Sequence, residues 1–87
     1  MGLFRRRPRP TDLHVGDPRF DPWEVVADYE DLETARAFAG QLAALGIDCA
    51  LTADWELDRF GRGDIALRVP PEAYGDATVA LDGLDLD

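Results

Sequence analysis

Three features of the sequence predict a small α+β domain. At 87 residues the chain is long enough for one domain with a thin core and too short for a deep catalytic cleft. Apolar residues alternate with polar ones over 23–28, 47–52 and 64–69, which is the pattern of half-buried strands. Over 32–45 they recur at three- and four-residue steps, which is the pattern of an amphipathic helix.

The first strand and the first helix follow each other directly. Apolar residues at every second position from Trp23 to Ala27 predict a strand that turns these side chains to one face. Asp31 can then cap the helix 32–45, because its carboxylate can accept hydrogen bonds from the free amides of the first turn. Gly46 follows as the C-terminal stop.

Two more strands and a second helix complete the pattern. The strand 47–52 places Cys49 on its apolar side, and no basic residue lies near in sequence to lower the thiol pKa, so a packed and inert thiol is expected. The strand 64–69 ends at two prolines, and Pro71 can begin the last helix. The inner face of that helix consists of small and apolar residues, Ala73, Ala77, Ala80, Leu81 and Leu84. A short final strand over 84–87 is left open.

The element order limits the topology. A right-handed crossover through helix 32–45 makes the first two strands parallel, and the third strand can fill the gap between them antiparallel to both. We therefore predict an α+β fold, a truncated ferredoxin-like β-α-β-β-α sandwich with a three-stranded sheet and two helices on one face. The edge of the first strand stays open in this arrangement, so a homo-oligomer formed by strand addition is plausible.

The N-terminal 21 residues differ from the domain predicted over 22–87. Four prolines in the first 22 residues oppose a helix, so 1–21 are predicted to form a flexible arm, mostly extended or disordered. The rest of the chain after residue 10 has a net charge of −13 and repels phosphates. Nucleic acid or an anionic membrane would therefore meet only the arm, at about 1 kcal/mol per arginine near anionic lipid. The basic residues of the arm are Arg5, Arg6, Arg7 and Arg9.

Two segments carry a resemblance to a known family. WEVVADYEDLETARAFAGQLAALGIDCAL and IALRVPPEAYGDATVAL, within 23–82, resemble small prokaryotic proteins named for signal transduction, a family whose biochemical role is unknown and whose fold is PII-like. The shared marks are Leu45-Gly46-Ile47 after the helix and Val69-Pro70-Pro71-Glu72 after the strand. Tyr74-Gly75 departs from the family pattern. The resemblance implies the fold and a regulatory role, and in the PII regulators the connection that corresponds to 53–63 contacts partners.

The segment ADWELDRFGRGD, between the second and third strands, allows two registers. In one, a strand runs over 47–57 and turns at RFGRG. In the other, the strands stop near Thr52, Leu51 faces Ile65, and residues 53–63 project as a loop. Both registers keep the same side chains inward, so periodicity does not choose between them, and the matching of strand lengths favours the wide loop.

We predict that the projecting loop binds a partner. Aromatic and arginine side chains concentrate binding energy at interfaces, and the loop holds Trp55, Arg59, Phe60 and Arg62. The alternative is that Trp55 and Leu57 fold back to cover the sheet.

Catalytic and metal chemistry is not indicated. The chain has one histidine, His14, and no serine, which excludes Ser-His and paired-His metal sites. Asp54, Glu56 and Asp58 have the spacing of a calcium loop, but Arg59 and Ile65 stand where that loop needs glycine and glutamate. No enzyme activity, cofactor or metal is expected.

The sequence therefore predicts a non-catalytic interaction or regulatory module that binds a protein partner through the 53–63 loop or an exposed sheet edge. The alternatives are an adaptor tethered by its basic arm to anionic lipid or RNA, and a small-molecule sensor. A single cysteine and the lack of an apolar run of about 18 residues favour the cytoplasm.

Overall fold

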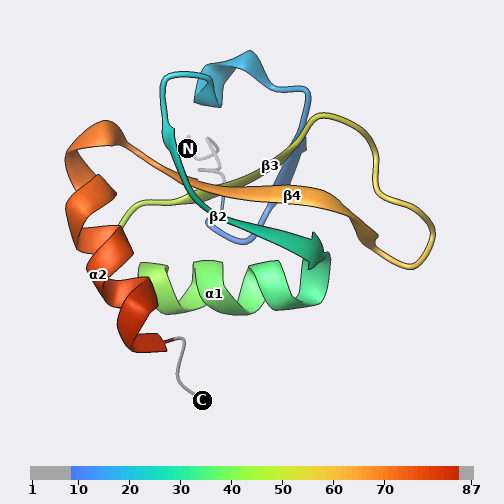
Figure 1. Cartoon of the computed structure of the whole chain (residues 1–87). Helices are drawn as coiled ribbons and strands as arrows, with labels where there is room; N and C mark the ends of the chain where they lie inside the picture. The colour runs from blue at the N-terminus through green and yellow to red at the C-terminus, as the bar shows by residue number, and fades with distance from the viewer. Residues whose placement is uncertain (1–8, 85–87) are drawn as a thin grey trace, which may run out of the picture.

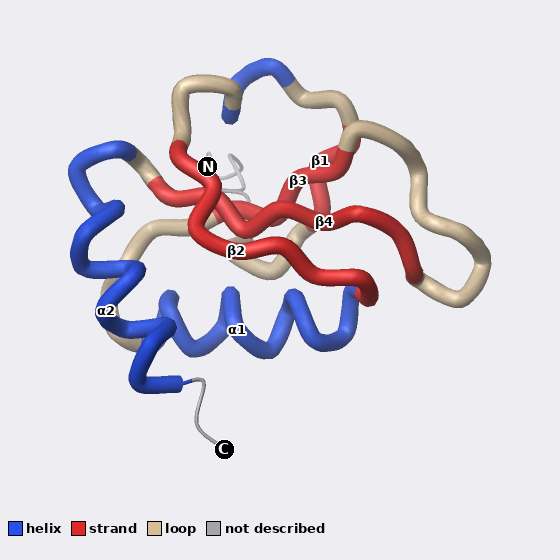
Figure 2. Tube along the Cα trace, in the orientation of Figure 1, coloured by secondary structure: helices blue, strands red, loops and turns tan. Residues whose placement is uncertain are grey.

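The computed structural model describes residues 9–84 and has an α+β architecture (Figure 1). The elements in chain order are β1 (Leu13–Val15), the 3-10 turn η1 (Pro18–Phe20), β2 (Glu24–Asp31), α1 (Leu32–Ala44), β3 (Ala50–Ala53), β4 (Arg62–Val69), the 3-10 turn η2 (Pro71–Ala73) and α2 (Tyr74–Leu84). Both helices lie on the same side of one sheet, and η1 lies on the other side (Figures 1 and 2).

The sheet is mixed and has four strands in the order β1-β3-β4-β2. β4 lies between β2 and β3 and is antiparallel to both, as predicted from the crossover. The prediction of three strands is wrong, because β1 adds a fourth by pairing parallel with β3, Leu13 opposite Leu51. The fold is therefore ferredoxin-like in class, with an additional N-terminal strand.

The N-terminal segment is part of the folded unit from Leu13 onward, contrary to the flexible arm predicted over 1–21. Gly16 N donates to Ala53 O over 2.8 Å, and the side chain of Phe20 is buried. β1 has three residues, which are too few to show the alternating pattern of a strand in the sequence. The prolines of this segment flank β1 and do not interrupt it, since Pro10 precedes the strand and Pro18 follows it.

The core lies between α1 and the sheet. Asp31 caps α1 by accepting from Thr34 N over 2.9 Å. The helix ends at Ala44, and Gly46, just beyond its C-cap, has a φ of 82°, the left-handed conformation expected of a glycine stop. Tyr29 of β2 stacks on Phe38 of α1, with ring centroids 5.2 Å apart. The fully buried core residues are Ala35, Ala39, Leu42, Leu51, Ile65, Leu67, Val69 and Ala77.

A bulge in β2 changes which residues of the first predicted strand face the helices. Val25 pairs with Arg68 and Ala27 pairs with Leu67, which are neighbours on β4 and so face opposite sides of the sheet. Ala27 packs against the core together with the bulge residue Val26, whereas Val25 is 40% exposed on the other side. Simple alternation from Trp23 to Ala27 is therefore wrong, because one extra residue, Val26, resets the pattern.

The register of β3 on β4 matches neither predicted register. Leu51 lies opposite Leu67, two residues further along β4 than the predicted partner Ile65. The shift by two preserves which side chains face the core, and it leaves 54–61 as the connection between the strands. α2 reaches Leu84, so that residue is helical, and the remainder of the possible strand over 84–87 lies outside the described residues.

Candidate interaction loop and N-terminal pocket

The connection between β3 and β4 projects beyond the end of the sheet (Figure 2). Its two aromatic side chains are among the most exposed large apolar groups in the described chain, with Trp55 79% and Phe60 72% exposed. The structure therefore follows the wide-loop alternative. Of the two side chains that the alternative expected to fold back and cover the sheet, Trp55 and Leu57, only Leu57 is half-buried and packs against the core.

A compact turn holds the end of the loop. Asp58 Oδ1 accepts hydrogen bonds from the backbone N–H groups of Phe60 and Arg62 over 2.8 and 2.9 Å. Gly61 N donates to Asp58 O, and Asp58 N donates to Arg62 O, both over 3.0 Å. Gly61 has a φ of 74°, which a residue with a side chain adopts only with strain. Asp58 is thus a turn residue rather than a member of a calcium site.

Two further contacts fasten the loop to the domain. Gly61 O accepts a hydrogen bond from Leu32 N, at the start of α1, over 2.9 Å. Gly63 leaves room for Leu57, because a Cβ at Gly63 would lie 2.7 Å from Leu57 Cδ2. Neither contact involves Trp55 or the ring of Phe60.

The two arginines predicted to lie in the loop, Arg59 and Arg62, lie in different elements. The Arg59 guanidinium lies 5.1 Å from the centroid of the Phe60 ring, within the range of a cation–π contact. Arg62 is the first residue of β4 and pairs with Asp31 across the sheet. The hydrogen bonds from Thr34, and then the charge of Arg62, hold the pKa of Asp31 below its ordinary value. Beside this contact lies a hollow of about 250 Å³, lined by Asp31, Leu32, Glu33, Phe60, Gly61 and Arg62.

A second candidate region lies on the side of the sheet away from the helices. Arg68 donates from Nη1 to Phe20 O and Trp23 O, and from Nε to Thr52 Oγ1. These bonds hold the turn η1 against the sheet. Sequence analysis missed this role of Arg68, which an arginine among the apolar residues 65–69 could have indicated, since a half-buried guanidinium needs acceptors.

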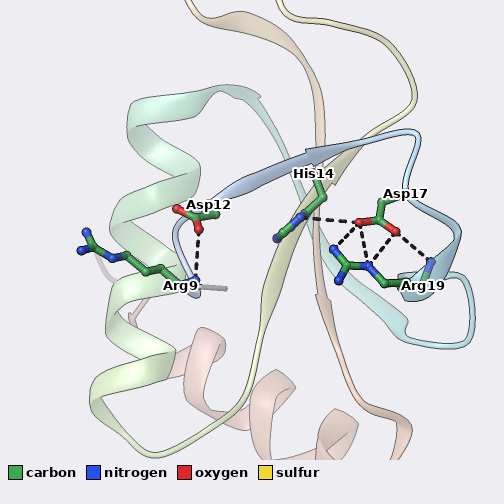
Figure 3. Close-up of polar contacts among 5 residues, drawn as sticks. All are labelled: Arg9, Asp12, His14, Asp17 and Arg19. Carbon is green, nitrogen blue, oxygen red and sulfur yellow. Dashed lines mark hydrogen bonds and ion pairs between the residues drawn. The ribbon is translucent and has the colours of Figure 1, made fainter. Parts of the chain in front are cut away.

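His14 and Arg19 both lie beside Asp17, whereas the Arg9 side chain points away from them (Figure 3). Arg19 clamps Asp17 through Nε and Nη2, the shortest contact being 2.6 Å, and this lowers the pKa of Asp17 to about 2. His14 Nδ1 lies 3.7 Å from the same carboxylate. Of the four predicted basic-arm residues the structure places Arg9 alone, and Arg5, Arg6 and Arg7 lie outside the described residues.

The single thiol has the environment predicted for an inert cysteine. Cys49 is buried, and its Sγ donates to Ala39 O over 3.4 Å. Burial, and then the charge of Asp48, raises the pKa of the Cys49 thiol to about 11. The thiolate that a nucleophile or a metal ligand requires is therefore scarce at neutral pH.

Within residues 9–84, no helix combines the length and apolarity needed to span a membrane. In the same residues no group of three or more histidine, cysteine, aspartate and glutamate side chains could hold a metal ion. Comparison of the chain with known protein families, with curated proteins and with solved structures found no match. The resemblance to small prokaryotic signal-transducing proteins thus stays a prediction from the sequence.

Proposed function

We propose that the protein is a non-catalytic interaction module that binds a protein partner through its 54–61 loop. The observation that carries the proposal is the exposure of Trp55 and Phe60, 79% and 72%, on a hydrogen-bonded loop. Leaving two aromatic rings in water forgoes the free energy that their burial would contribute to folding. A binding role accounts for their position.

The loop separates the residues that shape it from those it presents. Leu57, Asp58 and Gly61 make the contacts that hold the turn. Trp55 and Phe60 are free to contact another molecule. A loop held in one shape loses less conformational entropy on binding than a mobile one, so a small aromatic surface can contribute more net affinity.

The surroundings of the aromatic pair define the partner's surface. Arg59 lies against Phe60, while Asp54 and Glu56 are exposed beside Trp55. The hollow next to Phe60 is lined by Asp31, Glu33 and Arg62 and can take a polar side chain of the partner. A protein surface with an apolar patch for the two rings, surrounded by side chains of both charges, matches this chemistry.

The open edge of β2 is a weaker candidate for self-association. β2 ends the strand order and has one unpaired side among the described elements. It carries Glu24, Asp28, Glu30 and Asp31 along its eight residues. Pairing β2 with the β2 of a second copy would bring these carboxylates together, and like charges across a strand pair are destabilising. The loop is therefore the favoured contact surface.

The test uses a photo-crosslinking amino acid at position 55 or at position 79, in cells that make the protein. Val79 is a matched site, because it is 74% exposed but lies on α2. We expect a partner to be crosslinked from position 55 and not from 79. That partner is then purified, and its affinity for Trp55→Ala, Phe60→Ala and Val79→Ala proteins is measured by calorimetry.

The two loop variants should each weaken binding by about tenfold or more, as truncated aromatic anchors do, while Val79→Ala leaves the affinity unchanged. Circular dichroism and thermal unfolding must show that all three variants are folded. Equal affinities of the loop variants and the wild type would overturn the proposal.

A further inference from the structure

The open edge of β2 borders a hollow between the sheet and the two helices. β2 is the last strand in the order β1-β3-β4-β2, so its outer side pairs with no strand of the described chain. The hollow has a volume of about 340 Å³, and its lining residues come from β2, α1 and α2, with none from β3 or β4. It therefore lies at the outer edge of the sheet, where β2 passes the two helices (Figure 2).

The position beyond β2 is one that a complete ferredoxin-like fold fills with a strand. In the β-α-β-β-α-β pattern the last strand follows the second helix and pairs antiparallel with the first strand. β2, α1, β3, β4 and α2 correspond to the first five elements of this pattern, and no strand follows α2 within residues 9–84. A strand supplied by another molecule could take this position and cover the hollow.

The side chains of β2 differ in chemistry on the two faces of the sheet. Ala27 and Tyr29 face the helices, where Tyr29 stacks on Phe38 of α1. Asp28 and Glu30 are exposed, and neither forms an ion pair within the described residues. Alternate residues of a strand share a face, so these two carboxylates lie on the face away from the helices. An added strand would therefore meet an apolar hollow on one face and negative charge on the other.

The regular part of this edge is short. The pairing of β2 with β4 is irregular between Val25 and Ala27 and again between Tyr29 and Asp31. Irregularities of this kind protect a sheet edge from long, unspecific pairing. The three residues 27–29 keep a regular register with β4. Contacts in the hollow and at the carboxylates must therefore add to the few main-chain hydrogen bonds that a new strand can make here.

We propose that the β2 edge binds an extended peptide in which basic and apolar residues alternate. The peptide pairs antiparallel with residues 27–29, and one of its apolar side chains enters the hollow against Phe38 and Leu81. Its lysine or arginine side chains lie on the other face, beside Asp28 and Glu30. The same carboxylates disfavour an acidic peptide and the β2 strand of a second copy. The proposal does not depend on the function of the 54–61 loop.

NMR titration of the full chain, labelled with ¹⁵N, tests the proposal with three peptides blocked at both ends. Lys-Val-Lys-Phe-Lys-Val-Lys has the proposed alternation. Lys-Lys-Lys-Lys-Val-Val-Phe has the same composition without alternation. The third peptide has the first sequence with N-methyl groups on its three central residues, which removes main-chain donors. We expect the first peptide to bind at least about tenfold more tightly than the other two and to shift the amide resonances of 27–29.

Substitutions then locate the contacts. Asp28→Asn/Glu30→Gln protein should bind the first peptide about fivefold more weakly, as the loss of two exposed ion pairs predicts. Asp12→Asn/Asp48→Asn protein is the matched control, because it loses the same charge from exposed positions near β1 and β3, and its affinity should not change. Thr78 lines the hollow, so Thr78→Leu should weaken binding of the first peptide but not of Lys-Val-Lys-Ala-Lys-Val-Lys. Circular dichroism must show that all variants are folded.

Several results would overturn the proposal. They are equal binding of the alternating peptide and either control peptide, equal affinities of the two double variants, an unchanged affinity of Thr78→Leu protein for the first peptide, and binding that leaves the 27–29 resonances unmoved. Spectra without peptide test two other occupants. Resonances of 27–29 that move with protein concentration, or that differ in Arg5→Gln/Arg6→Gln/Arg7→Gln protein, would show that a second copy or the chain's own basic residues occupy the edge, and would also overturn it.

Discussion

The guanidinium of Arg68 donates a hydrogen bond to the backbone carbonyl of Phe20, 48 residues earlier in the chain, over 3.2 Å. The same Nη1 reaches Trp23 O, and Nε reaches Thr52 Oγ1. One side chain of the central strand β4 thus joins the N-terminal segment to β3. The positions of the Phe20 and Trp23 rings depend on these hydrogen bonds.

Replacing Arg68 with methionine should release the N-terminal segment. The variant keeps the aliphatic stem but removes three donated hydrogen bonds from a half-buried site, and we expect a loss of about 2 kcal/mol in the free energy of unfolding. Hydrogen exchange should accelerate most in residues 13–23. Arg36→Met is the matched control, because Arg36 makes a single exposed hydrogen bond to Thr11 O. Equal exchange in the two variants would contradict the assignment.

Gly63 and Leu57 should show coupled effects on stability. A methyl group at Gly63 would lie 2.7 Å from Leu57 Cδ2, so Gly63→Ala must displace that side chain, at a cost of about 1 kcal/mol. In a Leu57→Ala background the space is vacant, and the same change should cost almost nothing. Urea unfolding of the two single variants and the double variant measures the coupling. Additive effects would show that Leu57 does not pack there in solution.

The Asp17–Arg19 pair predicts a pH dependence of stability. The hydrogen bonds from Arg19 lower the pKa of Asp17 from an ordinary 3.8 to about 2. Its contribution is therefore fully present above pH 3.8 and is lost as the pH falls through 2. Wild-type protein should have a higher urea midpoint than Asp17→Asn protein at pH 5, and the two midpoints should converge near pH 2. A difference that persists at the lowest pH would argue against the carboxylate as its source.

Cys49 should react slowly with alkylating agents. The raised pKa of about 11, compared with an ordinary 9.0, lowers the thiolate fraction by about a hundredfold at pH 8, and burial restricts access further. The rate with iodoacetamide, followed by mass spectrometry, should rise by at least this factor in 8 M urea. A protein that combines Cys49→Ala with Val79→Cys supplies an exposed thiol on α2 for comparison. Comparable rates for Cys49 and for the thiol introduced on α2, each in folded protein, would show that Cys49 is accessible.

The spacing of apolar residues was enough to predict α1 and β4, because residues close together in the sequence determine where these elements lie. The helix was expected over 32–45 and spans Leu32–Ala44, because Asp31 and Gly46 mark its ends. β4 was expected over 64–69 and begins two residues earlier. Trp55 and Phe60 were correctly placed on a projecting loop by the matching of strand lengths.

The features that sequence reasoning missed depend on contacts between distant segments. β1 has three residues, and its strand conformation follows from pairing with β3 rather than from its own alternation. The alternation of apolar and polar residues does not reveal the bulge at Val26. A shift of two residues in the pairing of β3 with β4 leaves the same side chains facing the core, so alternation does not reveal this shift either. A hollow of about 660 Å³ is lined both by the N-terminal segment and by residues at the end of α1, so no single stretch of sequence could predict it.

The parallel pairing of β1 with β3 also bears on synthesis. Leu13 leaves the ribosome well before its partner Leu51, so β1 stays unpaired while the residues between them are made. Until then, the backbone groups of β1 are exposed to other nascent chains. The brevity of β1 and the acidic residues Asp12 and Asp17 on either side of it limit adventitious pairing during that interval.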